Sequence, residues 1–118
     1  MAAPNIVGVT TIIANTTVQA ATTVASNVVV NASGSNSVYK INAIMLSNYG
    51  ASNITANVDF LRSGTGYYIG GAIVVPANST LIASGKDTAF YMVEGDALRT
   101  WVSANSAAHI TVSYEVIS

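Results

Sequence analysis

The chain of 118 residues has no cysteine, a single histidine and few charged side chains. Without cysteine, neither a disulfide framework nor a thiolate metal site can stabilise the fold. Charged residues make up 8% of the sequence, against about 25% in typical soluble proteins. Only four residues are basic, fewer than the roughly six phosphate contacts of an ordinary nucleic-acid binder. We therefore expect no nucleic-acid partner.

Long hydrophobic runs are also missing. The longest aliphatic runs, such as Val28–Val30 and Ala72–Val75, are far shorter than the ~20 residues that a membrane-spanning helix needs. The first residues, Met1–Asn5, lack the positive charge that opens a secretory signal. At the same time 51% of the residues are hydrophobic and the net charge is only -1, which argues against disorder. The sequence predicts one folded domain with no membrane partner, whose apolar residues serve a core or protein contacts.

The residues that are abundant favour β-structure. Val, Ile, Thr and Tyr are common, whereas strong helix formers are rare. Strict alternation, as in Ile54–Phe60 and Ile110–Val116, is typical of half-buried strands. About seven such segments, separated by turn signals, follow one another from Tyr39 onward. We predict an all-β fold, an antiparallel β-sandwich of jelly-roll type with an extended N-terminal arm.

The alternating segments also predict the core and one irregularity. The pair Gly70-Gly71 interrupts an apolar strand and indicates a bulge or bend. The inward faces of the three clearest alternations are expected to form the core, and a Phe60→Ala change is expected to cost roughly 3 to 5 kcal/mol. These core positions are Ile41, Ala43, Met45, Ile54, Val58, Phe60, Ile110, Val112, Tyr114 and Val116.

The first part of the chain carries no charge at all. We predict two regions, an uncharged β-prone arm over residues 1–35 and a sandwich domain over residues 36–118. An uncharged terminal segment that is ordered needs a surface to cover it. It either docks as strands on another chain or supplies the first strands of its own sandwich, and the sequence leaves both open. Its apolar residues are Ile6, Val7, Val9, Ile12 and Ile13.

Few groups are available for catalysis or metal binding. His109 has no Gly-x-Ser-x-Gly element to pair with, and the acidic residues Asp87, Glu94 and Asp96 match no calcium-loop spacing. The glycine-rich stretch Gly64–Gly71 lacks the lysine of a phosphate loop. We therefore predict no enzyme activity, no cofactor and no metal. A small hydrolase using His109 with Asp87 or Glu94 is the least favoured alternative.

Four aromatic residues, Tyr49, Tyr67, Tyr68 and Trp101, permit a second kind of function. Aromatic faces can stack on carbohydrate rings, so these residues would suit a glycan-binding adhesin if they were exposed in a row. If they are packed inside or at a subunit contact, a structural role is favoured instead.

Several segments from Val38 onward resemble a known group of proteins. The region that contains them covers about two thirds of the chain, and the segments carry strand and turn signatures rather than catalytic ones. They are Val38–Ile44, Val58–Phe60, Val75–Leu81, Lys86–Thr88, Glu94–Arg99 and Val112–Glu115. In these segments the chain resembles small virion-associated proteins of tailed phages, cyanophages and other marine phages.

The resemblance implies a structural protein of the phage particle, assembled in the host cytoplasm. A head decoration or cement protein is the leading expectation, with a tail, adaptor or fibre component as the alternative. The implied partners are the major capsid protein or another virion protein, and further copies of the chain in a homotrimer. The low charge suits such burial, because permanent interfaces are poor in charge. Candidate assembly residues are Ile6, Val7, Val9, Ile12, Ile13, Tyr67, Tyr68 and Trp101.

Overall fold

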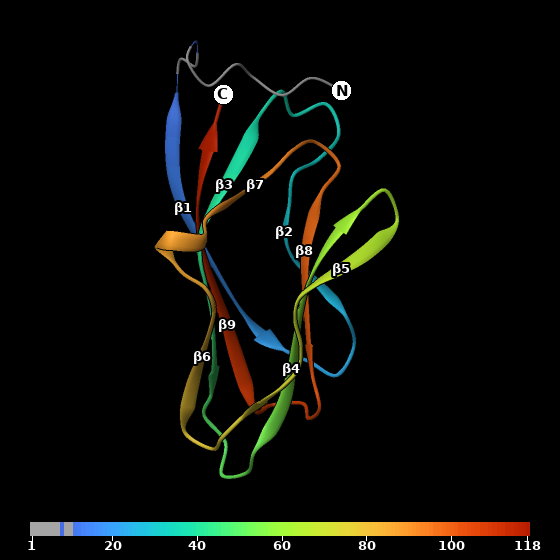
Figure 1. Ribbon diagram of the computed structural model, residues 1–118, viewed down its shortest axis with the longest axis vertical. Coiled ribbons are helices and arrows are strands. Elements are labelled where there is room, and N and C mark those ends of the chain that lie inside the picture. Colours follow the sequence, from blue (N-terminus) through green and yellow to red (C-terminus); the bar gives the residue numbers. More distant parts are fainter. Residues whose placement is uncertain (1–7, 9–10) are drawn as a thin grey trace.

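A computed structural model of the chain, which describes residue 8 and residues 11–118, shows two antiparallel sheets packed face to face (Figure 1). The strands follow the segments rich in Val, Ile and Thr, and the turns follow the Gly, Asn and Ser clusters, as the propensities of these residues predict. In chain order the elements are β1 (Ile12–Ala21), β2 (Ser26–Val30), β3 (Val38–Asn48), β4 (Ile54–Arg62), β5 (Thr65–Val75), β6 (Ser79–Ser84), the 3-10 turn η2 (Lys86–Thr88), β7 (Phe90–Met92), β8 (Ala97–Val102) and β9 (Ala108–Ile117).

The strand order is that of a jelly roll. The first sheet runs β1-β9-β3-β6 and the second runs β2-β8-β4-β5. Most successive strands therefore alternate between the two sheets. Strand β7 pairs with the part of β3 that lies beyond β6, so β6, η2 and β7 together line one edge of β3. The predicted all-β sandwich is confirmed.

Strands β1 and β2 lie inside the segment that we expected to form a separate arm. All ten residues of β1 pair with β9 of the same chain, and β2 pairs with β8. From Ile12 onward the uncharged segment therefore supplies the first strands of its own sandwich, which is the second of the two alternatives. The expected boundary at residue 35 is wrong for this part of the chain. Residues Ile6, Val7 and Val9 lie outside the described residues.

A bulge in β3 changes which side chains reach the core. The register with β9 shifts between Ile41 and Ala43, so two residues of β3 oppose one residue of β9 there. After the shift, Ile44 and Leu46 point inward and are fully buried, whereas Ala43 is only half-buried and Met45 faces solvent. The expectation that Ala43 and Met45 belong to the core is wrong, because simple alternation does not survive an inserted residue.

The hairpin of β4 and β5 contains the irregularity expected at Gly70-Gly71. The register between these strands shifts on both sides of Val58, opposite the stretch that holds Gly70. Ala72 adopts a positive φ of 51°, which is rare for a residue with a side chain. The bulge is confirmed.

The remaining expected core positions are mostly buried. Ile41, Ile54, Val58, Ile110, Val112 and Tyr114 have little exposed surface. Phe60 and Val116 are only partly buried and pack against the margin of the core. Because part of its ring surface stays solvated, a Phe60→Ala change is expected to cost less than the 3 to 5 kcal/mol of a fully buried phenylalanine.

The core consists of two clusters, one toward each end of the sandwich. The larger cluster contains long side chains from both sheets, and the smaller one contains three alanines among its seven residues. The larger set is Val28, Val29, Ile41, Ile44, Val58, Met92, Leu98, Ile110, Val112 and Tyr114. The smaller set is Ala21, Leu46, Ile54, Ala56, Val75, Val102 and Ala108.

Candidate functional site

The two ends of the sandwich differ in charge. The upper end in Figure 1 holds the turns 31–37, 63–64 and 93–96, and the lower end holds the loops 22–25, 49–53, 76–78 and 103–107. The four basic and five acidic residues all lie in the upper half or near the middle. The lower loops, and the strand segments that lead into them, contain none. The few charged side chains are thus confined to the upper half and the middle of the molecule, and the lower end has none.

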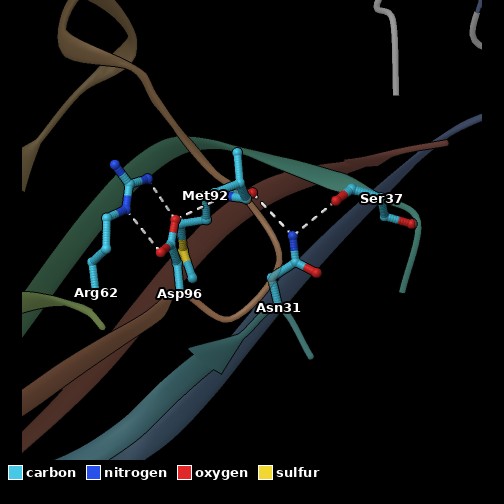
Figure 2. A network of polar contacts seen from close by, with 6 residues as sticks. Asn31, Ser37, Arg62, Met92 and Asp96 are labelled. Carbon is cyan, nitrogen blue, oxygen red and sulfur yellow. Dashed lines mark hydrogen bonds and ion pairs between the residues drawn. The ribbon is translucent and has the colours of Figure 1, made fainter. Parts of the chain in front are cut away.

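An ion pair and a buried amide hold the turns of the upper end together (Figure 2). The buried carboxylate of Asp96 accepts two hydrogen bonds from Arg62, at 2.9 and 2.6 Å, and one from the backbone N–H of Val93. The hydrogen bonds with Asp96 raise the pKa of the Arg62 guanidinium. The fully buried Asn31 amide donates to the carbonyls of Ser37 and Met92, both at 3.0 Å. These contacts join the turns 31–37 and 93–96 to the tip of β4.

At the lower end, asparagine side chains join the loops through hydrogen bonds. The buried amide of Asn48 donates to the carbonyls of Ser52, Val75 and Pro76 and accepts from the backbone N–H of Gly50. Asn53 accepts from the N–H of Ala77, and Asn105 accepts from the N–H of Thr23. The four lower loops are therefore held to one another and to the strands without any ion pair.

An apolar row crosses the outer face of the first sheet. In register, Val18 of β1 lies opposite Thr111 of β9, Thr111 lies opposite Met45 of β3, and Met45 lies opposite Ile82 of β6. Residues opposite each other in antiparallel strands point to the same face. Val18 is 68% exposed, Ile82 66% and Met45 36%. We call this set of four residues the apolar row.

The outer face of the second sheet carries a different set. Arg99 of β8, Asp59 of β4 and Tyr68 of β5 lie side by side in register. Arg99 donates from Nε and Nη2 to the Asp59 carboxylate at 2.9 and 2.5 Å, and these hydrogen bonds raise the pKa of the Arg99 guanidinium. The Tyr68 ring lies 5.9 Å from the ring of Trp101, centroid to centroid, at an angle of 51°. We call Tyr68, Trp101, Arg99 and Asp59 the aromatic patch.

The structure separates the residues that the sequence grouped as one assembly interface. Ile12 and Ile13 are exposed at the start of β1, at the upper edge of the first sheet. Tyr68 and Trp101 share the outer face of the second sheet. Tyr67 is next to Tyr68 in the strand and therefore points to the opposite face, where it is 59% exposed. Ile6, Val7 and Val9 lie outside the described residues.

The groups considered for catalysis are also apart. His109 is exposed on β9 near the lower end, where its ring stacks on Tyr49 with centroids 4.5 Å apart. Glu94 lies in a turn at the upper end, where it accepts a hydrogen bond from the N–H of Asn36, and Asp87 lies in η2. Within residues 8 and 11–118, no three His, Cys, Asp or Glu side chains come close enough to hold a metal ion. No helix in the described part of the chain is long and apolar enough to cross a membrane.

Sequence reasoning missed the apolar row. Met45 was assigned to the core, and Val18 and Ile82 were given no role. Each lies in a different strand, and only the pairing registers bring them together. The bulge in β3 is what turns Met45 outward. No local pattern marks Ile82 as outward, because it stands beside Leu81 in the same short apolar segment.

Comparisons with known proteins support the fold. No family model matches the chain, and no curated protein matches it. A solved structure from a study describing Bacillus endospore appendages as "a novel family of disulfide-linked pili" superposes with a TM-score of 0.53 at 15% identity. The superposition covers 99% of this chain and 95% of the other. The chain therefore shares its β-sandwich, over its full length, with a protein studied as part of a bacterial pilus.

Proposed function

We propose that this chain is a non-enzymatic structural subunit of a larger assembly and that it is a phage virion protein, with capsid decoration or cement as its role. The observation that carries the proposal is the uncharged lower half with its apolar row. A monomer gains nothing from keeping every charge out of one half of its surface, since charge keeps proteins apart in solution. A subunit that buries this half against its neighbours avoids the cost of desolvating charged groups.

The composition of the uncharged surface fits a protein contact. The exposed apolar side chains of the lower half, Val18, Val24, Met45, Val74 and Ile82, are spread over both sheets and a loop. They are separated by Ser, Thr, Asn and Ala, so the surface carries small polar groups between apolar ones. The cores of subunit interfaces are likewise depleted of charge. We propose a homotrimer as the assembled form.

Strand β1 supplies a second means of association. It lies at the edge of the first sheet, and its ten residues include no charge and no proline. Natural sheet edges usually carry charges or prolines that block pairing with other chains. We propose that β1 meets a neighbouring subunit and that the uncharged segment before it, which contains Ile6, Val7 and Val9, takes part in the contact.

The resemblance to virion-associated proteins supports the phage setting, with the major capsid protein or another virion protein as the partner. A tail, adaptor or fibre position would use the same surface. A filament subunit is a second candidate, favoured by the full-length superposition on the chain from the pilus study. Disulfide links of the kind named for those appendages are not available here, because the chain has no cysteine. Non-covalent contacts would have to hold such a filament together.

The apolar row can be tested directly by adding charge to it. We expect the unaltered chain to appear as a stable oligomer in native mass spectrometry and in sedimentation at micromolar concentration. Val18→Lys and Ile82→Lys should each lower the assembled mass, because a desolvated lysine at a contact has no partner there. Thr65→Lys, at an exposed position of β5 in the charged half, is the matched control and should leave the mass unchanged. A stable monomer of the unaltered chain would overturn the proposal.

The virion setting needs a separate measurement. Electron micrographs of phage particles prepared with and without the protein should differ in the density on the capsid surface. Density at the tail instead would assign the tail alternative. Long fibres formed by the purified chain alone would favour the filament candidate.

A further inference from the structure

We propose that the aromatic patch on the outer face of the second sheet is a saccharide-binding site that takes the apolar face of a neutral hexopyranose ring. This site is separate from the apolar row, which lies on the other sheet. The proposal rests on the geometry of four side chains from β4, β5 and β8, and it does not depend on the phage setting.

The Tyr68 ring supplies the stacking surface. Tyr68 is 66% exposed although it lies in the middle of a paired strand. Its ring lies over Gly71, where an added Cβ would come within 3.3 to 3.7 Å of ring atoms, and it meets the Trp101 ring at 51°. The glycine thus leaves room for the ring on the sheet, while much of the ring surface stays open to solvent. Pyranose rings present C–H groups on one face, and such groups pack on aromatic faces.

Arg99 supplies hydrogen-bond donors beside the rings. Its Nε and Nη2 are occupied by Asp59, and its Nη1 makes no hydrogen bond to any described residue. The guanidinium carbon lies 5.9 Å from the centre of the Trp101 ring, so the guanidinium group lies beside the aromatic rings. A sugar hydroxyl that reaches Nη1 gains a donor whose orientation is already set.

The charge of Arg99 is already balanced, which points to a neutral ligand. The Asp59 side chain is only 4% exposed and its carboxylate pairs with Arg99 through two parallel hydrogen bonds. An acidic sugar would have to compete with this carboxylate, whereas a hydroxyl can accept from Nη1 without disturbing the pair. Gly66 keeps space for the ion pair, because a Cβ at that position would meet the Asp59 carboxylate and lie 2.7 Å from Nη2 of Arg99.

A protein partner fits the patch less well. A dry apolar contact would leave the Nη1 donors of Arg99 buried without an acceptor, which is costly. Positions beside the rings, Gly71, Ala72 and Asn57, offer small or polar groups. A saccharide combines a C–H face for the rings with a rim of hydroxyls for Arg99. We therefore choose a saccharide over a protein as the occupant.

The single tryptophan makes the site easy to observe. Trp101 is the only tryptophan of the chain, so intrinsic fluorescence excited at the indole reports on this patch alone. The probes are maltotetraose, cellotetraose, laminaritetraose and mannotetraose, titrated into the full-length chain. We expect at least one of them to give a saturable change in Trp101 fluorescence. We also expect contact of its ring protons with tyrosine in saturation-transfer NMR.

Two neighbouring tyrosines provide a matched pair of variants. Tyr68→Ala should weaken binding by about tenfold or more, because it removes the stacking surface. Tyr67→Ala, equally exposed but on the opposite face of the same strand, should leave the affinity unchanged. Tyr68→Phe should retain most of the binding, since the ring remains. Circular dichroism of each variant shows whether it is folded.

Three results would overturn the proposal. The first is no saturable response to any of the four tetrasaccharides. The second is an equal loss of binding in Tyr67→Ala. The third is a Trp101 signal that changes on dilution of the protein alone, together with a lower oligomer mass for Tyr68→Ala, which would assign the patch to a subunit contact. The apolar-row variants Val18→Lys and Ile82→Lys should bind saccharide normally, so failure of this site and failure of the proposed assembly surface are distinguishable.

Discussion

The upper and lower ends of the sandwich both join their loops through a buried asparagine amide, but only the upper end adds an ion pair. At the upper end, Asp96 and Arg62 join the turns through an ion pair. At the lower end, amides such as Asn48 and Asn105 join the loops with neutral hydrogen bonds. Both ends satisfy their buried polar side chains, since no buried side-chain nitrogen or oxygen of the described residues lacks a partner. Closing the loops therefore does not require charge, and the absence of charge from the lower half needs another reason, which the proposed burial in an assembly would supply.

The cores under the two ends differ as well. The cluster toward the upper end contains Met92, Leu98 and Tyr114, whereas the lower one contains small side chains at Ala21, Ala56 and Ala108 among others. Small residues bury less apolar area, so the lower end gains less free energy of folding from its own core. The lower end has a core of small side chains and an uncharged surface. Contact with a neighbouring subunit would therefore add more stability to the lower end than to the upper end.

The largest expected effect tests the difference between the cores. Ile44 and Leu46 are fully buried, two residues apart on β3, and belong to the upper and lower clusters respectively. Ile44→Ala should lower the free energy of unfolding by about 4 kcal/mol and Leu46→Ala by about 3, because the smaller cluster beside the loops can close more of its cavity. Urea denaturation of the isolated subunit measures both. A larger loss for Leu46→Ala would reverse the comparison.

The positions of these two residues also show what the sequence could and could not predict. Alternation correctly placed Ile54, Val58 and Ile110 in the core, because β4 and β9 keep their inward face over these stretches. It failed on β3, where Ala43 and Met45 were expected inside, because a bulge depends on the pairing with β9 and leaves no local signature at Asn42. Periodicity therefore predicted the sandwich and the inward faces of β4 and β9, but not the inward face of β3 beyond its bulge.

The surfaces were harder to predict than the core for the same reason. Tyr68 and Trp101 come from β5 and β8, which are not neighbours in the sheet, and only a long side chain leaning across β4 brings the rings together. The four loops of the uncharged lower half are far apart in the sequence: the loop 22–25 lies in the uncharged first part of the chain, and the other three lie between charged segments. Their grouping depends on the jelly-roll connectivity, which no single segment encodes.

The second prediction concerns the charges themselves. Arg99→Met should cost about 3 kcal/mol of stability, because it leaves the buried Asp59 carboxylate without its partner, and the partial exposure of Arg99 keeps the loss at the low end of the usual range. The double variant Arg99→Met with Asp59→Leu removes the carboxylate as well. It should recover most of the loss, as the replacement of a buried pair by apolar groups often does. Chemical denaturation gives both values, and a double variant no more stable than Arg99→Met would contradict this account.

The third prediction tests the uncharged hydrogen bonds that join the loops of the lower end. Asn48→Ala should cost about 2 kcal/mol, because the carbonyls of Ser52, Val75 and Pro76 lose their shared donor and the hydrogen bond to Val75 is buried. Asn53→Ala is the matched control, since Asn53 is exposed and makes one loop hydrogen bond, to Ala77. It should cost less than about 1 kcal/mol. Thermal unfolding of both variants measures the difference, and equal losses would show that burial of Asn48 is not what matters.

The smallest expected effect on stability separates folding from assembly at the lower end itself. Val24 is 70% exposed in the loop after β1 and has no part in either core cluster. Val24→Asp should therefore change the free energy of unfolding by no more than about 0.5 kcal/mol, as exposed substitutions generally do. Thr65→Asp at the opposite end should change the free energy of unfolding equally little. If the lower loops lie in the subunit contact, however, only Val24→Asp will reduce the assembled mass in sedimentation. If both variants assemble normally while Ile82→Lys does not, the contact lies on the face of the first sheet, and the lower loops remain outside it.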